Sequence, residues 1–121
     1  MSAVLVICSD LIFSTKIKGT AQALGIEARF VPEGTSVAWT DDVPRLIIDL
    51  NTAGTSADDL RRLRQMFVPP IEMVAFGSHV DVARLKGARE AGCDLVLPRS
   101  TFVERLISLI DPFQPLSDGR D

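Results

Sequence analysis

The chain has 121 residues, of which 46% are hydrophobic and 24% are charged, and its formal net charge is −3. These values are typical of one soluble globular domain. They argue against the basic surface of a nucleic-acid-binding protein and against a polybasic membrane-binding segment. The longest apolar runs are too short to cross a bilayer, and no basic stretch precedes the first of them as it would in a signal peptide. We therefore expect a cytoplasmic protein with neither a nucleic-acid partner nor a membrane partner.

Two cysteines, Cys8 and Cys93, indicate a reducing compartment. They belong to no CxxC pair and to no Cys/His metal spacing, so we expect free, buried thiols, no metal site and no cofactor. A redox role for Cys8 is the alternative. It is disfavoured because no basic residue follows Cys8 closely to lower its pKa.

Five short apolar segments predict strands, at residues 3–8, 27–31, 46–49, 71–76 and 94–97. The first, third and fourth are nearly continuous apolar runs, as in central strands that are buried on both faces. The second alternates polar and apolar residues, which favours a position at the edge of the sheet.

Helical patterns fill the segments between these strands. Residues 10–24 are expected to form a helix that ends at Gly25, with Gly19 allowing a close approach to a neighbouring element. The expected apolar stripe of this helix is Ile12, Phe13, Ile17, Ala21 and Leu24.

Three more helices are expected further along the chain. Ser56 is the predicted N-cap of one that ends before Pro69. Its apolar stripe is Leu60, Leu63 and Phe67, and its solvated face is Arg61, Arg62 and Arg64. Residues 80–91 form the next helix, and residues 101–104 have the pattern of a capping box before a last helix containing Leu106, Ile107 and Ile110. The domain is expected to cover residues 1–111, followed by a polar tail at 112–121.

The connection between the second and third strands, residues 32–44, has only 13 residues and can hold at most a short helix. Trp39 lies in this connection. It either covers the sheet where the helix is truncated or anchors a partner protein.

Asp49 ends the apolar run at 46–49 and is the main candidate for a functional residue. Strands that alternate with helices predict a parallel sheet with right-handed crossovers and helices on both faces. Such sheets bind ligands at the carboxyl ends of their strands, and a charge inside an apolar run is costly unless it is paired or solvated. The alternative is that Asp49 only caps the turn that follows.

The order and spacing of these segments over residues 3–110 resemble the receiver domains of the CheY-like response-regulator family. Residues 48–51, Ile-Asp-Leu-Asn, are similar to the phosphoacceptor strand end of that family, and residues 91–94, Ala-Gly-Cys-Asp, are similar to the turn before its fifth strand. The resemblance implies an α/β, flavodoxin-like three-layer α/β/α fold. Its five-stranded parallel sheet would have the order 2-1-3-4-5, with a truncated second helix.

The chemical groups of the family are mostly replaced in this chain. Cys8 and Ser9 stand where two acids would hold Mg²⁺, and Asp10 lies one position beyond them. Gly77 stands where the family has a hydroxyl residue, with Ser78 next to it, and Val96 occupies the aromatic switch position. Arg99 replaces the family lysine and is followed by Ser100. The resemblance is therefore to a degenerate receiver, or pseudo-receiver. We expect Arg99 to reach over Gly77 and pair with Asp49.

These observations favour a stand-alone, non-catalytic signalling domain that acts through protein–protein contacts without phosphorylation. In the family, the fourth helix, fifth strand and fifth helix form the commonest contact face, and a homodimer could use it. Here that face would draw on Arg84, Lys86, Arg89, Glu90, Glu104 and Arg105. No output domain is expected after Ile110.

Two alternatives remain open from the sequence. One is a true single-domain response regulator of two-component signal transduction, phosphorylated on Asp49, with Ser9, Asp10 and Arg99 completing a modified site. The other is a small-ligand or anion binder at the sheet switch point. His79 is expected to be a solvated loop residue in either case.

Overall fold

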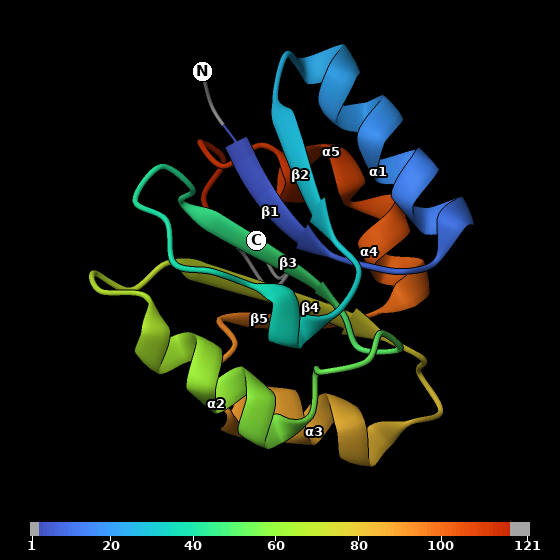
Figure 1. Ribbon diagram of the computed structural model, residues 1–121. Coiled ribbons are helices and arrows are strands. Elements are labelled where there is room, and N and C mark those ends of the chain that lie inside the picture. Colours follow the sequence, from blue (N-terminus) through green and yellow to red (C-terminus); the bar gives the residue numbers. More distant parts are fainter. Residues whose placement is uncertain (1–2, 117–121) are drawn as a thin grey trace.

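The five strands form one parallel sheet in the order β2-β1-β3-β4-β5 in the computed structural model, which describes residues 3–116 (Figure 1). The strands are β1 (Ala3–Ile7), β2 (Glu27–Val31), β3 (Arg45–Asp49), β4 (Glu72–Gly77) and β5 (Leu95–Pro98). In the register of the sheet Ile7 pairs with Ile48, and Asp49 pairs with Phe76. The carboxyl ends of the central strands therefore lie together at one end of the sheet. The flavodoxin-like strand order implied by the resemblance is confirmed.

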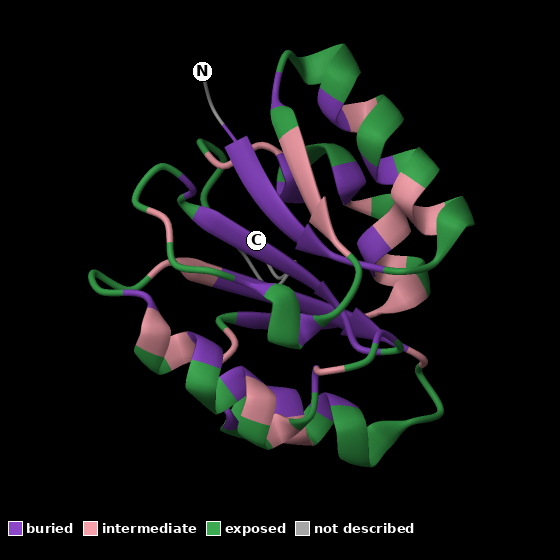
Figure 2. Cartoon of the chain, viewed as in Figure 1, coloured by how far each residue is buried: buried purple, intermediate pink, exposed green. Residues whose placement is uncertain are grey.

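Helices cover both faces of the sheet. α1 (Leu11–Leu24), α4 (Arg99–Glu104) and α5 (Leu106–Ile110) lie on one face, and α2 (Ala57–Met66) and α3 (Val82–Glu90) lie on the other (Figure 1). Each face buries its own apolar cluster, and the central strands are buried along most of their length (Figure 2). No helix within residues 3–116 combines the length and the apolar character needed to cross a membrane.

Helix α1 begins and ends where the sequence predicted, but its buried stripe is narrower. Asp10 caps its N-terminus and Gly25 ends it with a φ of 70°. Only Ile17 and Ala21 are buried within it, whereas Ile12 is 77% exposed. The expected close approach at Gly19 is wrong, because a Cβ built there would meet nothing within 4 Å. The helix packs against the edge strand β2 and against α5.

Helix α2 has the capping box Ser56–Asp59 at its start, and the predicted residues Leu60, Leu63 and Phe67 are buried. Its basic face is only partly solvated. The Arg64 side chain donates to the carbonyls of Ile71 and Gly92 and to the Asp94 carboxylate. Arg64 therefore joins α2 to the segment before β4 and to the segment between α3 and β5, a role that the helical periodicity could not reveal.

The last helical segment differs from the prediction. α4 starts at Arg99, directly after β5, so Thr101 lies inside a helix and is not an N-cap. The chain then breaks at Arg105, which has non-helical angles of φ −106° and ψ 16° and separates α4 from α5. Phe102 stacks on Phe76 of β4 at 4.0 Å between ring centroids, which brings α4 onto the sheet. Of the three apolar residues expected in the last helix, Leu106 and Ile110 are buried and Ile107 is exposed.

The connection at 32–44 holds a single turn of 3-10 helix, η1 (Gly34–Ser36), as the truncated second helix implied. η1 lies against the loop that follows β3, where a Cβ on Gly34 would come within 1.8 Å of the Gly54 carbonyl oxygen. The Gly34 N–H donates to the Ala53 carbonyl at 2.9 Å. The absence of a side chain at residue 34 therefore permits this contact.

Cys8 and Cys93 are both free thiols, as predicted. Strands β3 and β4 lie between β1, which leads to Cys8, and β5, which follows Cys93. Cys93 is half-buried and not fully buried as expected. Of the predicted polar tail, residues 112–116 are described, and residues 117–121 lie outside the described residues.

Candidate functional site

The carboxyl ends of three strands bring Cys8, Asp49 and Arg99 together. Cys8 follows β1, Asp49 ends β3, and Arg99 follows β5 as the first residue of α4. Asp49 is almost completely buried, with 1% of its surface exposed, whereas the Arg99 side chain is 28% exposed. The carboxylate is thus shielded by its neighbours while the cation that faces it reaches solvent.

Both oxygens of Asp49 have hydrogen-bond donors from the protein. Its Oδ1 accepts from the Asn51 backbone N–H at 3.0 Å and from Arg99 Nη2 at 3.3 Å. Its Oδ2 accepts from the Cys8 thiol at 3.5 Å. The Asp49–Arg99 contact expected from the sequence is present. A buried carboxylate with a facing guanidinium and two further donors is compensated without any added ion.

The thiol of Cys8 acts here as a neutral donor. Burial raises the pKa of Cys8, and the nearby Asp49 carboxylate raises it further. The thiolate is the reactive form of cysteine, so these surroundings disfavour the redox role that was considered for Cys8.

Arg99 reaches Asp49 by a different path from the one expected. Its guanidinium carbon lies 4.9 Å from the centroid of the Phe13 ring and 6.0 Å from that of Phe76. Gly77 faces the other side of the sheet, where an added Cβ would contact Leu50 at 3.3 Å. Successive residues of a strand point to opposite faces, so Phe76, and not Gly77, lies beside Arg99. The aromatic rings form the surface on which the guanidinium lies.

The other residues predicted for the site lie at its rim. Ser9 is exposed, and its N–H donates to Thr52 Oγ1 at 3.2 Å. Asp10 turns away from Asp49, and its carboxylate accepts from the Phe13 N–H at 3.0 Å as the N-cap of α1. A hollow of about 550 Å³ beside Arg99 is lined in part by Ser78 and His79.

Two buried threonines and one arginine were missed by the sequence reasoning. Thr55 Oγ1 donates to the Thr52 carbonyl at 2.7 Å and accepts from Arg84 Nη2 at 3.1 Å. Arg84 of α3 also donates to the Leu50 carbonyl. The hydroxyl-rich stretch at residues 51–56 directly after β3 was the signal that could have identified this loop. These contacts join α3 to the loop that follows Asp49.

The donor set does not fit the Mg²⁺ ion that receiver folds use. The Asp49 carboxylate lies in the site, and its oxygens already face a thiol and a guanidinium. Asp10 serves as a helix cap. Within residues 3–116 no three His, Cys, Asp or Glu side chains are grouped so that they could hold a metal ion. Mg²⁺ prefers several hard oxygen ligands in octahedral geometry, and these residues do not supply them.

Solved structures share this fold at low sequence identity. A response regulator receiver protein from Pseudomonas putida superposes with a TM-score of 0.73 and 16% identity, over 90% of this chain and 94% of that one. A Saccharomyces cerevisiae receiver domain, crystallised with a histidine phosphotransfer signalling protein, gives 0.72 and 12%, over 96% and 93%. A Burkholderia pseudomallei response regulator with a phosphorylated aspartic acid, a calcium ion and citrate gives 0.71 and 17%, over 91% and 66%.

Comparison of sequences gives no relatives: no protein-family model matches the chain, and no curated protein matches it. The structural matches span most of the chain, and all three of those described are response regulators or their receiver domains. The chain therefore has the fold of the CheY-like receiver domains of response regulators.

Proposed function

We propose that this chain is a receiver-like signalling domain that acts through protein–protein contacts without phosphorylation of Asp49. The observation that carries the proposal is that groups of the protein donate to both Asp49 oxygens. The donors are the Cys8 thiol, the Asn51 backbone N–H and the Arg99 guanidinium of α4. A phosphoacceptor needs an oxygen that can attack and a cation that neutralises the transferred group. Here the facing cation already pairs with the carboxylate, and the acid pair that would hold Mg²⁺ is replaced.

The same contacts favour a single arrangement of the loops around Asp49. A domain switches only when a ligand or a modification interacts differently with its two states. In this proposal no metal or phosphoryl group biases a second state, so the surface that meets a partner is displayed constantly. A protein that recognises a receiver surface would then bind this domain regardless of the phosphorylation state of its pathway.

The proposed contact face is the one expected from the family's fourth helix, fifth strand and fifth helix. In this chain η1 takes the place of the second helix, so these elements are α3, β5 and α4. The face would meet a partner protein or a second copy of the chain. Its charged residues are not equally available. Arg84 is directed at the loop that follows β3, and Lys86 lies 3.8 Å from Glu90 of the same helix. Arg89 and Glu104 are exposed and remain the residues of this set best placed to meet a partner.

The test is an incubation of the protein with acetyl phosphate, with and without millimolar Mg²⁺, followed by intact mass measurement. We expect no added phosphoryl group and no saturable NMR shift at Asp49 or its neighbours on addition of Mg²⁺. A receiver domain of known activity serves as the positive control for the donor, and Asp49→Asn controls for phosphorylation elsewhere. A phosphoryl group present on the parent and missing from Asp49→Asn would replace this proposal with that of a working single-domain response regulator.

One observation supports anion binding as a second candidate. The hollow beside Arg99 includes His79 and Ser78, and Arg99 Nε is buried and has no hydrogen-bond partner among residues 3–116. Glu104 also lines this hollow and would repel an anion. A thermal-shift titration with phosphate tests the idea, because an anion that binds the folded state raises the unfolding midpoint. An unchanged midpoint up to high phosphate concentration rejects it.

A further inference from the structure

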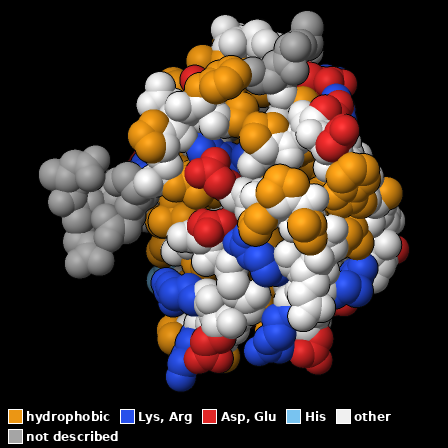
Figure 3. All heavy atoms as spheres, turned by 90° about the vertical axis from the view of Figure 1, so that its left-hand side faces the viewer, with side chains coloured by type: hydrophobic (Ala, Val, Ile, Leu, Met, Phe, Trp, Pro, Cys, Tyr) orange, Lys and Arg blue, Asp and Glu red, His pale blue; other side chains and the backbone are white. Residues whose placement is uncertain are grey.

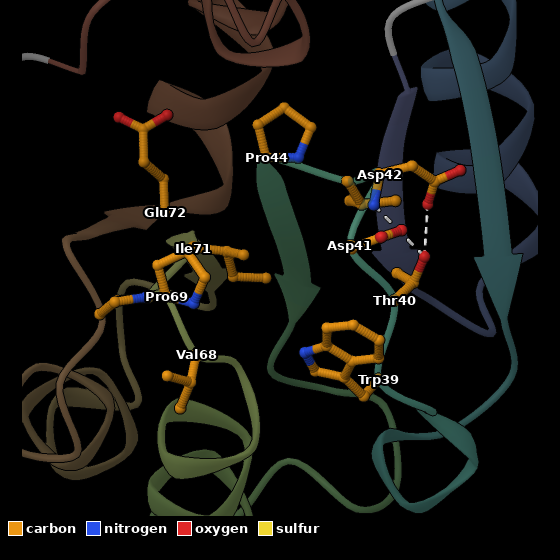
Figure 4. A pocket seen from close by; sticks show the side chains of 11 residues that line it. Trp39, Thr40, Asp41, Asp42, Pro44, Val68, Pro69, Ile71 and Glu72 are labelled. Atoms are coloured by element: carbon orange, nitrogen blue, oxygen red, sulfur yellow. Dashed lines mark hydrogen bonds between the residues drawn. The ribbon is translucent and has the colours of Figure 1, made fainter.

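A cleft of about 490 Å³ opens at the amino ends of β3 and β4, at the opposite end of these strands from Asp49. Two connections form its walls, residues 39–44 before β3 and residues 68–72 at the start of β4 (Figure 4). The two segments are distant in the sequence and become neighbours because β3 and β4 are adjacent parallel strands.

Exposed hydrophobic side chains face this cleft. Trp39 is 53% exposed and Val68 is 73% exposed, and Pro69 and Pro70 are exposed beside them. In Figure 4 the Trp39 ring lies across the cleft from Val68 and Pro69. Trp39 therefore covers the sheet only in part, and about half of its surface remains available to a partner. Exposed tryptophans at the centre of such patches are frequent anchors of protein interfaces.

The charged side chains of the cleft are all acidic. Asp41, Asp42 and Glu72 line it, and none of the described residues that line it is Lys, Arg or His. Asp42 is bound by Arg29 at 2.7 Å, and Glu72 is bound by the buried Arg45 at 2.8 Å. Asp41 is exposed and forms no ion pair within residues 3–116. Figure 3 shows this side of the molecule, where acidic and hydrophobic side chains lie next to one another.

We propose that this cleft binds an extended peptide segment of another protein in which an Arg or Lys stands next to proline or another apolar residue. The apolar residue would lie between Trp39 and Val68, where the aromatic and proline surfaces complement it. The cation would lie near Asp41, the carboxylate of the cleft that forms no ion pair within residues 3–116. Aromatic-lined grooves recognise proline-containing extended segments in this manner, and a guanidinium is also attracted to the face of an indole ring.

This chemistry excludes other classes of occupant. A nucleic acid or a phosphorylated peptide would bring negative charge against the carboxylates of Asp41, Asp42 and Glu72. A purely apolar segment would leave Asp41 without a partner. The proposal goes beyond the function proposed above and does not depend on it. The phosphodonor experiment examines Asp49, whereas the experiment below examines Trp39, so the two can fail separately.

Trp39 provides a built-in reporter, because it is the only tryptophan of the chain and the chain has no tyrosine. The probe is a set of acetylated hexapeptide amides that carry one Arg or Lys next to proline or leucine and contain no aromatic residue. Each peptide has a partner in which the basic residue is replaced by Glu. We expect saturable changes of the Trp39 emission for the basic peptides and at least about tenfold weaker binding for the Glu partners. The absence of any saturable response up to about 1 mM peptide overturns the proposal.

Two variants assign the response to the cleft. Asp41→Asn should weaken binding of the best basic peptide about fivefold, and it should reduce the dependence of binding on salt. Asp58→Asn is the matched control. It removes an exposed acid from α2, outside the cleft, and should bind as the parent does. Equal binding by Asp41→Asn and the parent, or equal binding of the Arg and Glu peptides, would also overturn the proposal.

Discussion

Arg45 and Glu72 form an ion pair at the amino ends of β3 and β4, with Arg45 Nη2 and Nε at 2.8 Å and 3.1 Å from the same Glu72 oxygen. The Arg45 side chain is completely buried, whereas that of Glu72 is 41% exposed. Arg45 Nη1 and Nη2 also donate to the backbone carbonyls of Leu109, Asp111 and Gln114 at 2.9, 2.9 and 2.6 Å. One guanidinium therefore connects the sheet to the end of α5 and to the segment that follows it.

Arg45→Met is expected to destabilise the fold by about 3 kcal/mol, because it leaves carbonyl groups at the end of α5 without donors. Glu72→Gln should cost only about 1 kcal/mol. Glu72 is partly solvated, and the amide keeps an oxygen that can accept from Arg45. Urea unfolding of the parent and both variants at pH 7 measures the difference. If the two substitutions cost the same, the carbonyl contacts of Arg45 contribute nothing beyond the ion pair.

Arg99→Ala is expected to destabilise the fold by about 2 kcal/mol, more than Asp49→Asn does. The first substitution leaves a buried carboxylate without its cation, whereas Asn keeps the shape of the side chain and an acceptor for the Asn51 N–H. Equilibrium unfolding of the single variants and the double variant gives the coupling energy between the residues. A coupling energy indistinguishable from zero would mean that the Arg99–Asp49 contact has no energetic importance.

Two glycines should respond to alanine in opposite directions. Gly34→Ala is expected to cost at least about 2 kcal/mol, because the new Cβ would overlap the Gly54 carbonyl and force the backbone to move. Gly19→Ala should stabilise the protein by roughly 0.5–1 kcal/mol, since the position is helical and has free space around it. The thermal unfolding midpoints of the two variants provide the measurement. A neutral Gly34→Ala would show that η1 does not hold its close contact with the loop after β3.

The stability of the protein should fall as pH rises above 9, in part through Cys93. Burial raises the pKa of this thiol from 9.0 to about 12 in the folded state. Between these values the unfolded chain loses the proton and the folded chain keeps it, so proton release favours unfolding. The urea midpoint should therefore fall more between pH 8 and pH 10 for the parent than for Cys93→Ala. Lys side chains and Cys8 are present in both proteins, so the difference between the two isolates the Cys93 thiol. An equal fall of the midpoint in both proteins would contradict the raised pKa of Cys93.

Local sequence patterns predict the strands of the sheet and the position of its candidate acid. Alternating apolar runs and amphipathic segments predicted all five strands to within two residues at each end. The helix cap at Ser56 and the helix end at Gly25 lie where the local patterns placed them. These signals involve residues within a few positions of one another, so the sequence contains them in full. The loss of the acid pair at Cys8 and Ser9 is likewise visible without a structure.

The segment after β5 shows how tertiary contacts override a local pattern. The residues from Thr101 to Glu104 match a capping box, yet α4 begins before them. The stacking of Phe102 on Phe76 places these residues against the sheet as part of a helix that starts at Arg99. Packing energy of this kind exceeds the roughly 1 kcal/mol that an N-cap contributes.

Contacts between residues that are distant in the sequence depend on the tertiary structure. Arg45 precedes an apolar run and gave no sign of being buried, because its acceptors lie 27 to 69 positions further along the chain. The path of the Arg99 side chain depends on which face of the sheet Phe76 occupies. The acidic cleft at Trp39 exists only because the segments 39–44 and 68–72 lie side by side. Such contacts arise from the register of neighbouring strands and from the docking of helices. Periodicity and turn chemistry carry no information about either of them.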